Sequence, residues 1–122
     1  MPASRKVQED ILEEFLNEVI EWRNKHERMI SIFRSMGDEF SDKEAALAEL
    51  SADSYAWVLF SALEAGKTID SPRDVLRAVN DGLDKQVEKV LTADLYPSFE
   101  VNSHYGYVRH QISEEIRKMD NG

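Results

Sequence analysis

The sequence predicts an all-α protein: a small four-helix bundle with one long N-terminal helix, which we expect to be oligomeric. Apolar residues recur at three- and four-residue steps, the spacing of amphipathic helices. Glycine and proline divide this pattern into four segments, and no alternating run is long enough to predict a strand convincingly. The length of 122 residues favours a single domain spanning residues 1–122.

The first predicted helix spans residues 5–36, a stretch that contains neither glycine nor proline. Gly37 then provides a plausible stop. At 1.5 Å per residue this helix is roughly 45 Å long, too long for the rest of the chain to cover completely. We therefore expect part of it to meet a second copy or a partner. Its apolar stripe consists of Val7, Ile11, Phe15, Val19, Trp22, Ile30 and Phe33.

The second predicted helix begins at Ser41 and runs to Ala65, just before Gly66. The sequence Ser41-Asp-Lys-Glu44 has the pattern of a capping box, in which the serine and the glutamate satisfy backbone N–H groups reciprocally. Residues 55–63 are apolar on nearly every side of this helix. We expect it to be the central and most buried element.

The third helix is predicted to begin with Ser71 as its N-cap and Pro72 in its first turn. Gly82 inside it costs about 1 kcal/mol relative to alanine, so we expect it to mark a close approach of two helices. Residues 99–102 are expected to form a short extended piece. The last helix is predicted over residues 104–119.

Charge indicates which partners to expect. The chain has 24 Asp and Glu against 15 Lys and Arg, a net charge of −9 that is spread along its length. Direct binding to nucleic acid or to an anionic membrane requires clustered cations and is disfavoured. The absence of cysteine, of a long apolar span and of a signal-peptide core favours a soluble, cytoplasmic protein.

Two carboxylate pairs are candidates for chemistry: Glu14 with Glu18, and Glu49 with Asp53. Each pair is spaced i, i+4 and so lies on one helix face. Asp53 falls where the helical pattern expects an apolar residue, so it requires a partner if it is buried. Four convergent carboxylates would suit Mg²⁺. Solvated or structurally paired carboxylates are the alternative in so acidic a chain.

The middle of the chain supplies a family resemblance. The stretch from Glu49 to Asp53, followed by residues 55–60, 66–70 and 79–81, resembles the second half of the all-α nucleotide pyrophosphohydrolases of the MazG and dCTP pyrophosphatase type. That family uses E-x-x-E and E-x-x-D motifs, whereas both carboxylate pairs here have one more intervening residue. The resemblance implies Mg²⁺-dependent hydrolysis of nucleoside triphosphates, with Lys67 or Lys85 facing phosphate and with the ligands Glu14, Glu18, Glu49 and Asp53.

Histidines and aromatics form two further candidates. His26 lies at the centre of the apolar stripe of the first helix, where it either bonds to a carbonyl or to a carboxylate such as Asp53 or Glu49, or acts as a titrating group. Residues 96–110 gather tyrosines, histidines and an arginine, the types that anchor protein interfaces or pack a helix against a bundle. The members of this cluster are Tyr96, Phe99, His104, Tyr105, Tyr107, Arg109 and His110.

Together these observations favour a non-enzymatic, acidic protein-binding module without a cofactor. Such a protein would act as an inhibitor, immunity factor or regulator that docks on a basic protein surface, including one that normally holds nucleic acid. The pyrophosphohydrolase with Mg²⁺ is the alternative. The residues expected to steer docking are Glu14, Glu18, Glu21, Asp38 and Glu39, and the expected anchors are Tyr105, Tyr107 and Arg109.

Overall fold

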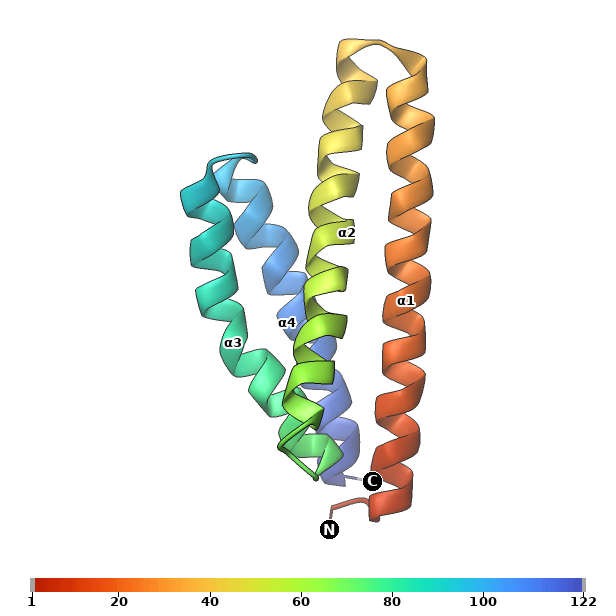
Figure 1. Ribbon diagram of the computed structural model, residues 1–122, viewed down its shortest axis with the longest axis vertical. Helices are drawn as coiled ribbons and strands as arrows, with labels where there is room; N and C mark the ends of the chain where they lie inside the picture. Colours follow the sequence, from red (N-terminus) through yellow and green to blue (C-terminus); the bar gives the residue numbers. More distant parts are fainter. Residues whose placement is uncertain (1, 122) are drawn as a thin grey trace.

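The computed structural model describes residues 2–121 and contains four helices: α1 (Arg5–Met36), α2 (Glu39–Gly66), α3 (Pro72–Ala93) and α4 (Ser98–Asn121). Successive helices run in opposite directions and form two hairpins, α1–α2 and α3–α4 (Figure 1). Both ends of the chain lie at the same end of the bundle. The predicted all-α, four-helix architecture is confirmed, and no strand occurs within residues 2–121.

Local signals in the sequence account for several helix ends. Ser71 is the N-cap of α3, since its side chain accepts a hydrogen bond from the backbone N–H of Asp74, and Pro72 occupies the first turn, as predicted. Gly37 ends α1 with φ of 73°, a left-handed conformation that glycine adopts without strain. Ser4 caps the start of α1, because its hydroxyl oxygen accepts a hydrogen bond from the backbone N–H of Val7.

The predicted capping box at Ser41 is wrong. Asp38 caps α2 instead: its carboxylate accepts from the backbone N–H of Ser41 at 2.7 Å and from the Ser41 hydroxyl at 2.9 Å. Gly37 turns the chain so sharply that Asp38 is already in extended, cap-like conformation and the helix begins at Glu39. Ser41 consequently lies inside α2 and is buried.

The predicted extended piece at residues 99–102 is also wrong, because α4 begins at Ser98 rather than near residue 104. The carbonyl of Pro97 accepts the backbone N–H of Val101, which starts the helical hydrogen-bond pattern. Val101 is fully buried, so the early turn of α4 is held by core packing. That tertiary support outweighs the β-propensity of the local sequence.

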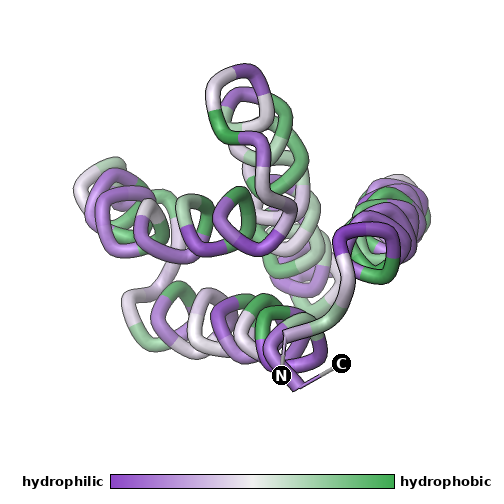
Figure 2. The backbone as a smooth tube through the Cα atoms, turned by 90° about the horizontal axis from the view of Figure 1, so that it is seen from below, coloured by the Kyte–Doolittle hydropathy of each residue, from purple (hydrophilic) through white to green (hydrophobic). Residues whose placement is uncertain are grey.

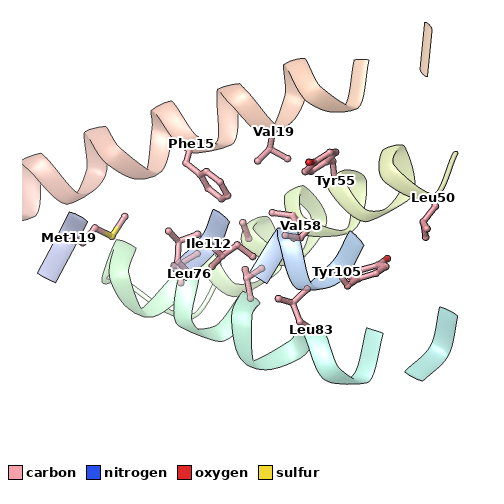
Figure 3. Close-up of a cluster of buried hydrophobic side chains, with 14 of the residues drawn as sticks. Phe15, Val19, Leu50, Tyr55, Val58, Leu76, Leu83, Tyr105, Ile112 and Met119 are labelled. Carbon is pink, nitrogen blue, oxygen red and sulfur yellow. The ribbon is translucent and has the colours of Figure 1, made fainter. Parts of the chain in front are cut away.

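The core lies between the four helices, and Figure 3 shows side chains from all of them meeting there. As expected, α2 is the most buried element, since it contains more buried residues than any other helix, although every pair of helices is in contact. Gly82 of α3 faces the Trp57 ring of α2, but the two helices are not so close that glycine is required, since a Cβ at this position would lie 3.4 Å from the ring. The largest fully buried apolar side chains are Leu76, Leu83, Ile112, Met119, Val19, Val58, Val79, Val101 and Val108.

The two ends of the bundle differ. At the end that holds the chain termini, the backbone N–H of Ala3 donates to the carbonyl of Met119 at 2.7 Å. The Arg5 guanidinium binds the Asp70 carboxylate there at 3.0 Å. At the opposite end, the turn between α1 and α2 projects beyond the turn between α3 and α4 (Figure 1). Only two helices of the described chain pack together at this tip, and they leave Phe40 70% exposed.

Polar and apolar residues alternate around every helix (Figure 2), as amphipathic packing requires. Among the described residues, no helix combines the length and the apolar composition that crossing a membrane requires.

Candidate functional site

The first candidate site, which we call the histidine pocket, is a cavity of about 320 Å³ between α1, α2 and α4. Residues that the sequence places far apart meet here, because α2 and α4 both pack against α1. Its lining consists of Trp22, Lys25, His26, Ser51, Tyr55, His104, Tyr107 and Gln111.

Hydrogen bonds define the protonation of both imidazoles. The Nδ1 of His26 lies 2.7 Å from the carbonyl of Trp22, which only accepts, so this nitrogen carries the proton. Ser54 donates its hydroxyl to the carbonyl of Ser51 at 2.7 Å, and its oxygen therefore accepts from Nε2 of His104. Of the alternatives predicted for His26, the structure has the bond to a carbonyl and not the one to a carboxylate such as Asp53 or Glu49.

Tyr55 lies between the two histidines. Its ring centroid is 5.9 Å from that of His26 and 5.7 Å from that of His104. Burial and, secondarily, the proximity of His26 lower the pKa of His104 to about 4. His104 is therefore neutral at physiological pH. Ser54 is fully buried beside it, so the serine ties α2 to α4 and is not accessible to a substrate.

A second candidate site, the tyrosine pocket, has a volume of about 410 Å³. It lies between α2, α3, α4 and the connection from α3 to α4. Polar and apolar side chains share its walls, the composition typical of small-molecule sites. The lining residues are Leu50, Asp53, Gln86, Lys89, Val90, Ala93, Leu95, Tyr96 and Tyr105.

The charges of the tyrosine pocket centre on Asp53. Burial, followed by the nearby charge of Glu49, raises the pKa of Asp53. The Tyr96 hydroxyl donates to this carboxylate at 3.4 Å, and burial together with the charges of Glu49 and Asp53 raises the pKa of Tyr96 strongly. Glu49 is paired with Arg34 of α1 at 2.6 Å. Although the helical pattern expects an apolar residue at this position, Asp53 remains exposed at the rim.

The structure does not bring the four candidate metal ligands together within one chain. Glu49 and Asp53 are neighbours, but Glu49 pairs with Arg34. Arg34 marks the level of α1 that faces Glu49. Glu18 lies 16 residues before Arg34, roughly 24 Å along the helix axis, and Glu14 is still further from Glu49. Within residues 2–121, no three histidine or acidic side chains are grouped so that they would hold a metal ion.

The expected docking carboxylates fall into two separate groups. Glu14, Glu18 and Glu21 are exposed and share one flank of α1, which we call the acidic flank. None of them forms a salt bridge with another described residue. Asp38 and Glu39 are exposed at the projecting tip, roughly 25 Å further along, where Asp38 acts as a helix cap.

Among the expected anchors, only Tyr107 is freely exposed, at 57%. The prediction for Tyr105 is wrong, since its side chain is only 2% exposed in the core; its position in α4 faces α2 and α3. Arg109 points toward α3, where it pairs with Asp84 and donates to the carbonyl of Asn80. Tyr107 and Glu21 lie on one face of the molecule. Tyr107 lines the histidine pocket and Glu21 lines a neighbouring pocket, and the two pockets share Trp22 and Lys25.

A third feature, the apolar groove, has a volume of about 640 Å³ between α1, α2 and the start of α3. Phe60 and Leu63 of α2 border it and are 63% and 68% exposed. The remaining lining residues are Leu12, Leu16, Ala62, Glu64, Gly66, Lys67 and Val75.

Comparison of the chain with protein-family models, curated proteins and solved structures finds no match. The resemblance to the all-α pyrophosphohydrolases remains a prediction that rests on the residues quoted for it.

Three partners in these sites were not predicted from the sequence: Tyr55 and Ser54 beside the histidines, and Tyr96 beside Asp53. Ser54 lies 50 positions from His104, and Tyr96 lies 43 positions from Asp53, so no spacing rule signals these pairs. The apolar groove had one available signal, the widening of the first helix's stripe by Leu12 and Leu16. That pattern shows which residues are apolar but not which of them another helix covers.

Proposed function

We propose that this protein is a non-enzymatic protein-binding module that associates with a second copy through the apolar groove and docks on a basic partner through the acidic flank. The exposure of Phe60 and Leu63 beside the groove is the observation that carries the proposal. Large apolar side chains gathered at one place on a surface are typical of interfaces, whereas isolated ones are ordinary.

Charge favours a second copy as the occupant of the groove. Two chains of net charge −9 repel each other, so self-association requires a contact without uncompensated carboxylates. The groove meets this requirement, because its two charged lining residues, Glu64 and Lys67, pair with each other at 2.8 Å. Burial of Phe60 and Leu63 then supplies an apolar driving force. This contact would also cover part of the long helix α1.

The acidic flank supports a separate contact with a basic partner. On the helical wheel Glu14, Glu18 and Glu21 lie opposite Leu16, which lines the groove. Self-association through the groove would leave these carboxylates free. Side chains without an internal cation contribute their full charge to the attraction of a basic surface, which raises the association rate at low salt.

Self-association is tested by sedimentation velocity and light scattering over a range of protein concentrations. We expect the wild type to dimerise and Leu63→Glu to remain monomeric, because the new carboxylate would be buried without a partner. Leu95→Glu is the matched control, since Leu95 is 74% exposed away from the groove. A wild type that stays monomeric at every concentration, or a Leu63→Glu variant that dimerises normally, would contradict the proposal.

Docking on a basic surface is tested with poly-L-lysine in a salt titration. The triple variant Glu14→Gln, Glu18→Gln, Glu21→Gln should bind more weakly and with a shallower salt dependence, since fewer charges take part. The control triple variant, Asp42→Asn, Asp81→Asn, Glu88→Gln, has the same net charge but keeps the acidic flank. Equal weakening by both variants would show that net charge alone is responsible and would refute a role for this flank.

A further inference from the structure

The projecting tip carries an apolar surface that the rest of the described chain leaves largely uncovered (Figure 1). Ile32 and Met36 of α1, Phe40 of α2 and Phe99 in the first turn of α4 are all more than half exposed. Large apolar side chains that gather on a surface in this way are typical of binding sites. We call these four residues, together with Leu47 of α2, the tip face.

The two residues of α1 lie on the flank of that helix that faces α4 further down. Lys25 lines the histidine pocket, which α4 closes on one side. Ile32 and Met36 follow Lys25 by seven and eleven residues, so they continue the same flank toward the tip. The Met36 sulfur lies 3.3 Å from the hydroxyl oxygen of Ser41, which places it against the first turn of α2.

The two residues of α2 belong to a stripe that α4 covers lower down. Phe40 and Leu47 are spaced i, i+7 and therefore share one side of α2. Leu47 lines a cavity of about 270 Å³ together with Glu100 and Ser103 of α4. Phe99 precedes Ser103 by one turn and so lies on the same side of α4. The stripe is thus covered at the level of Leu47 and bare at Phe40, two turns higher.

The bare segment has the dimensions of a site for a helix. From Leu47 to the first residue of α2 the helix axis rises by roughly 12 Å, enough for about two turns of a helix parallel to it. Ile32 with Met36 and Phe40 with Leu47 form two rows, the kind of ridges between which the side chains of another helix pack. A helix placed here would continue the packing that α4 begins below.

Two partly buried carboxylates beside the tip face have no cationic partner among the described residues. Glu44 lies between Phe40 and Leu47 along the stripe of α2, and Glu100 lines the cavity below it. Lys25 lies two turns below the tip face, beside the histidine pocket. The cations between residues 29 and 49 are already committed to other carboxylates, in the pairs Arg34–Glu49 and Lys43–Glu39. The tip face therefore attracts a partner that carries cations.

We propose that the tip face binds a basic amphipathic helix of another protein. The apolar side of this helix packs against Ile32, Met36 and Phe40, and its Lys or Arg side chains pair with Glu44 and Glu100. Such docking of one helix on an apolar face is a common mode of peptide recognition. The site is distinct from the apolar groove and from the acidic flank, and it does not depend on either contact.

A second copy of this chain is a less suitable occupant of the tip face. Two tip faces in contact would bring Glu44 and Glu100 of both chains together, while the cations at this level are already paired. The apolar groove differs in this respect, since its charged residues Glu64 and Lys67 pair with each other. A basic partner removes the repulsion and covers the apolar side chains at the same time.

The proposal is tested with a fluorescent helical peptide of about four turns that has leucines on one side and lysines on the other. A peptide of the same composition in scrambled order, which has no apolar side, is the control for charge alone. Binding to the full chain is followed by fluorescence anisotropy. We expect the amphipathic peptide to bind saturably and about tenfold tighter than the scrambled one, a difference of about 1.4 kcal/mol. Equal affinities would overturn the proposal.

Two exposed phenylalanines of α2 provide matched variants. Phe40→Ala should weaken binding of the amphipathic peptide about tenfold with little change in Tm, because the side chain is largely exposed. Phe60→Ala, the same change beside the apolar groove, should preserve the affinity. Equal effects of the two variants on binding would refute the site. A wild-type dimer that Phe40→Ala disrupts and Phe60→Ala preserves would show that a second copy occupies the tip face, which also contradicts the proposal.

Charge is tested with the double variant Glu44→Gln, Glu100→Gln, which should weaken binding of the amphipathic peptide and flatten its salt dependence. The control Glu14→Gln, Glu18→Gln removes the same net charge from the acidic flank and should retain most of the affinity. A loss of affinity in the control alone would show that the peptide docks on the acidic flank. That result would support the proposed function while refuting the tip face as the site.

Discussion

The imidazole Nε2 of His104 lies 2.5 Å from the hydroxyl oxygen of Ser54. This contact joins α4 to α2 at a place where both side chains are mostly or completely shielded from water. The serine hydroxyl is committed to the carbonyl of Ser51, so the contact fixes His104 in its Nε2-protonated, neutral form.

Acid should destabilise the protein through His104. Its pKa of about 4 in the folded protein lies below the ordinary value of 6.5, so the unfolded chain binds the extra proton first as the pH falls. The contribution is complete above about pH 6.5 and is lost as the pH falls toward 4. We expect a loss of about 2 kcal/mol between pH 7 and pH 4.5 in urea unfolding, allowing for partial solvent screening.

His104→Gln is the matched control for this pH effect, because the glutamine amide can still donate to Ser54 but does not titrate. The difference in unfolding free energy between wild type and variant should shrink as the pH falls. A difference that stays constant from pH 7 to pH 4.5 would contradict the role of His104.

Asp38 should be the residue that starts α2. Hydrogen bonds from the backbone and hydroxyl of Ser41 lower the pKa of Asp38, so the folded state favours the carboxylate and this contribution is lost as the pH falls through the lowered pKa. Asp38→Ala should lower Tm by a few degrees, whereas Asp38→Asn should retain most of the cap. A larger effect of Glu44→Ala than of Asp38→Ala in thermal unfolding would instead favour the capping box.

Gly82 should tolerate a methyl group. A Cβ there would lie 3.4 Å from the Trp57 ring, an ordinary van der Waals distance. Gly82→Ala should therefore raise the free energy of unfolding by up to about 1 kcal/mol through helix propensity. Gly106→Ala is the control, since a Cβ at this position of α4 would have nothing within 4 Å. Destabilisation by Gly82→Ala alone, measured in urea, would show that the helices cannot adjust.

The same isoleucine-to-alanine substitution should have different effects on stability at a buried and at an exposed position. Ile112 is completely buried and Ile32 is 55% exposed near the projecting tip. Ile112→Ala should lower the free energy of unfolding by about 3 kcal/mol, because it leaves a cavity in the core. Ile32→Ala should change it by less than about 0.5 kcal/mol. Comparable losses in urea unfolding would show that another chain covers the tip, a contact different from the one that we propose at the apolar groove.

The sequence predicted helices well wherever local chemistry decides the structure. Ser71 with Pro72, and Gly37 after a long uninterrupted stripe, are signals that act within a few residues. The start of α4 escaped prediction, because Val101 is held in the helix by core contacts from other elements. Asp38 and Ser41 are both residue types that cap helices, and they lie three positions apart. The left-handed turn at Gly37 places Asp38 in the cap position.

The candidate sites were less accessible to prediction than the fold. Helical spacing placed Glu49 and Asp53 together correctly, but it could not place them relative to Glu14 and Glu18 on another helix. The offset between α1 and α2 is determined by the length of their turn and by packing, neither of which appears in a helical wheel. Tyr105 illustrates the same limit: its residue type suggested an interface, and its position in α4 buried it.

The projecting tip of the α1–α2 hairpin implies a gradient of local stability along the two longest helices. Amide hydrogens beside α3 and α4 exchange with solvent only when the whole bundle opens, whereas those near Gly37 have a single neighbouring helix to protect them. Exchange should therefore accelerate toward the turn, and limited proteolysis should begin there. A partner that grips this tip would slow both processes without altering the four-helix core.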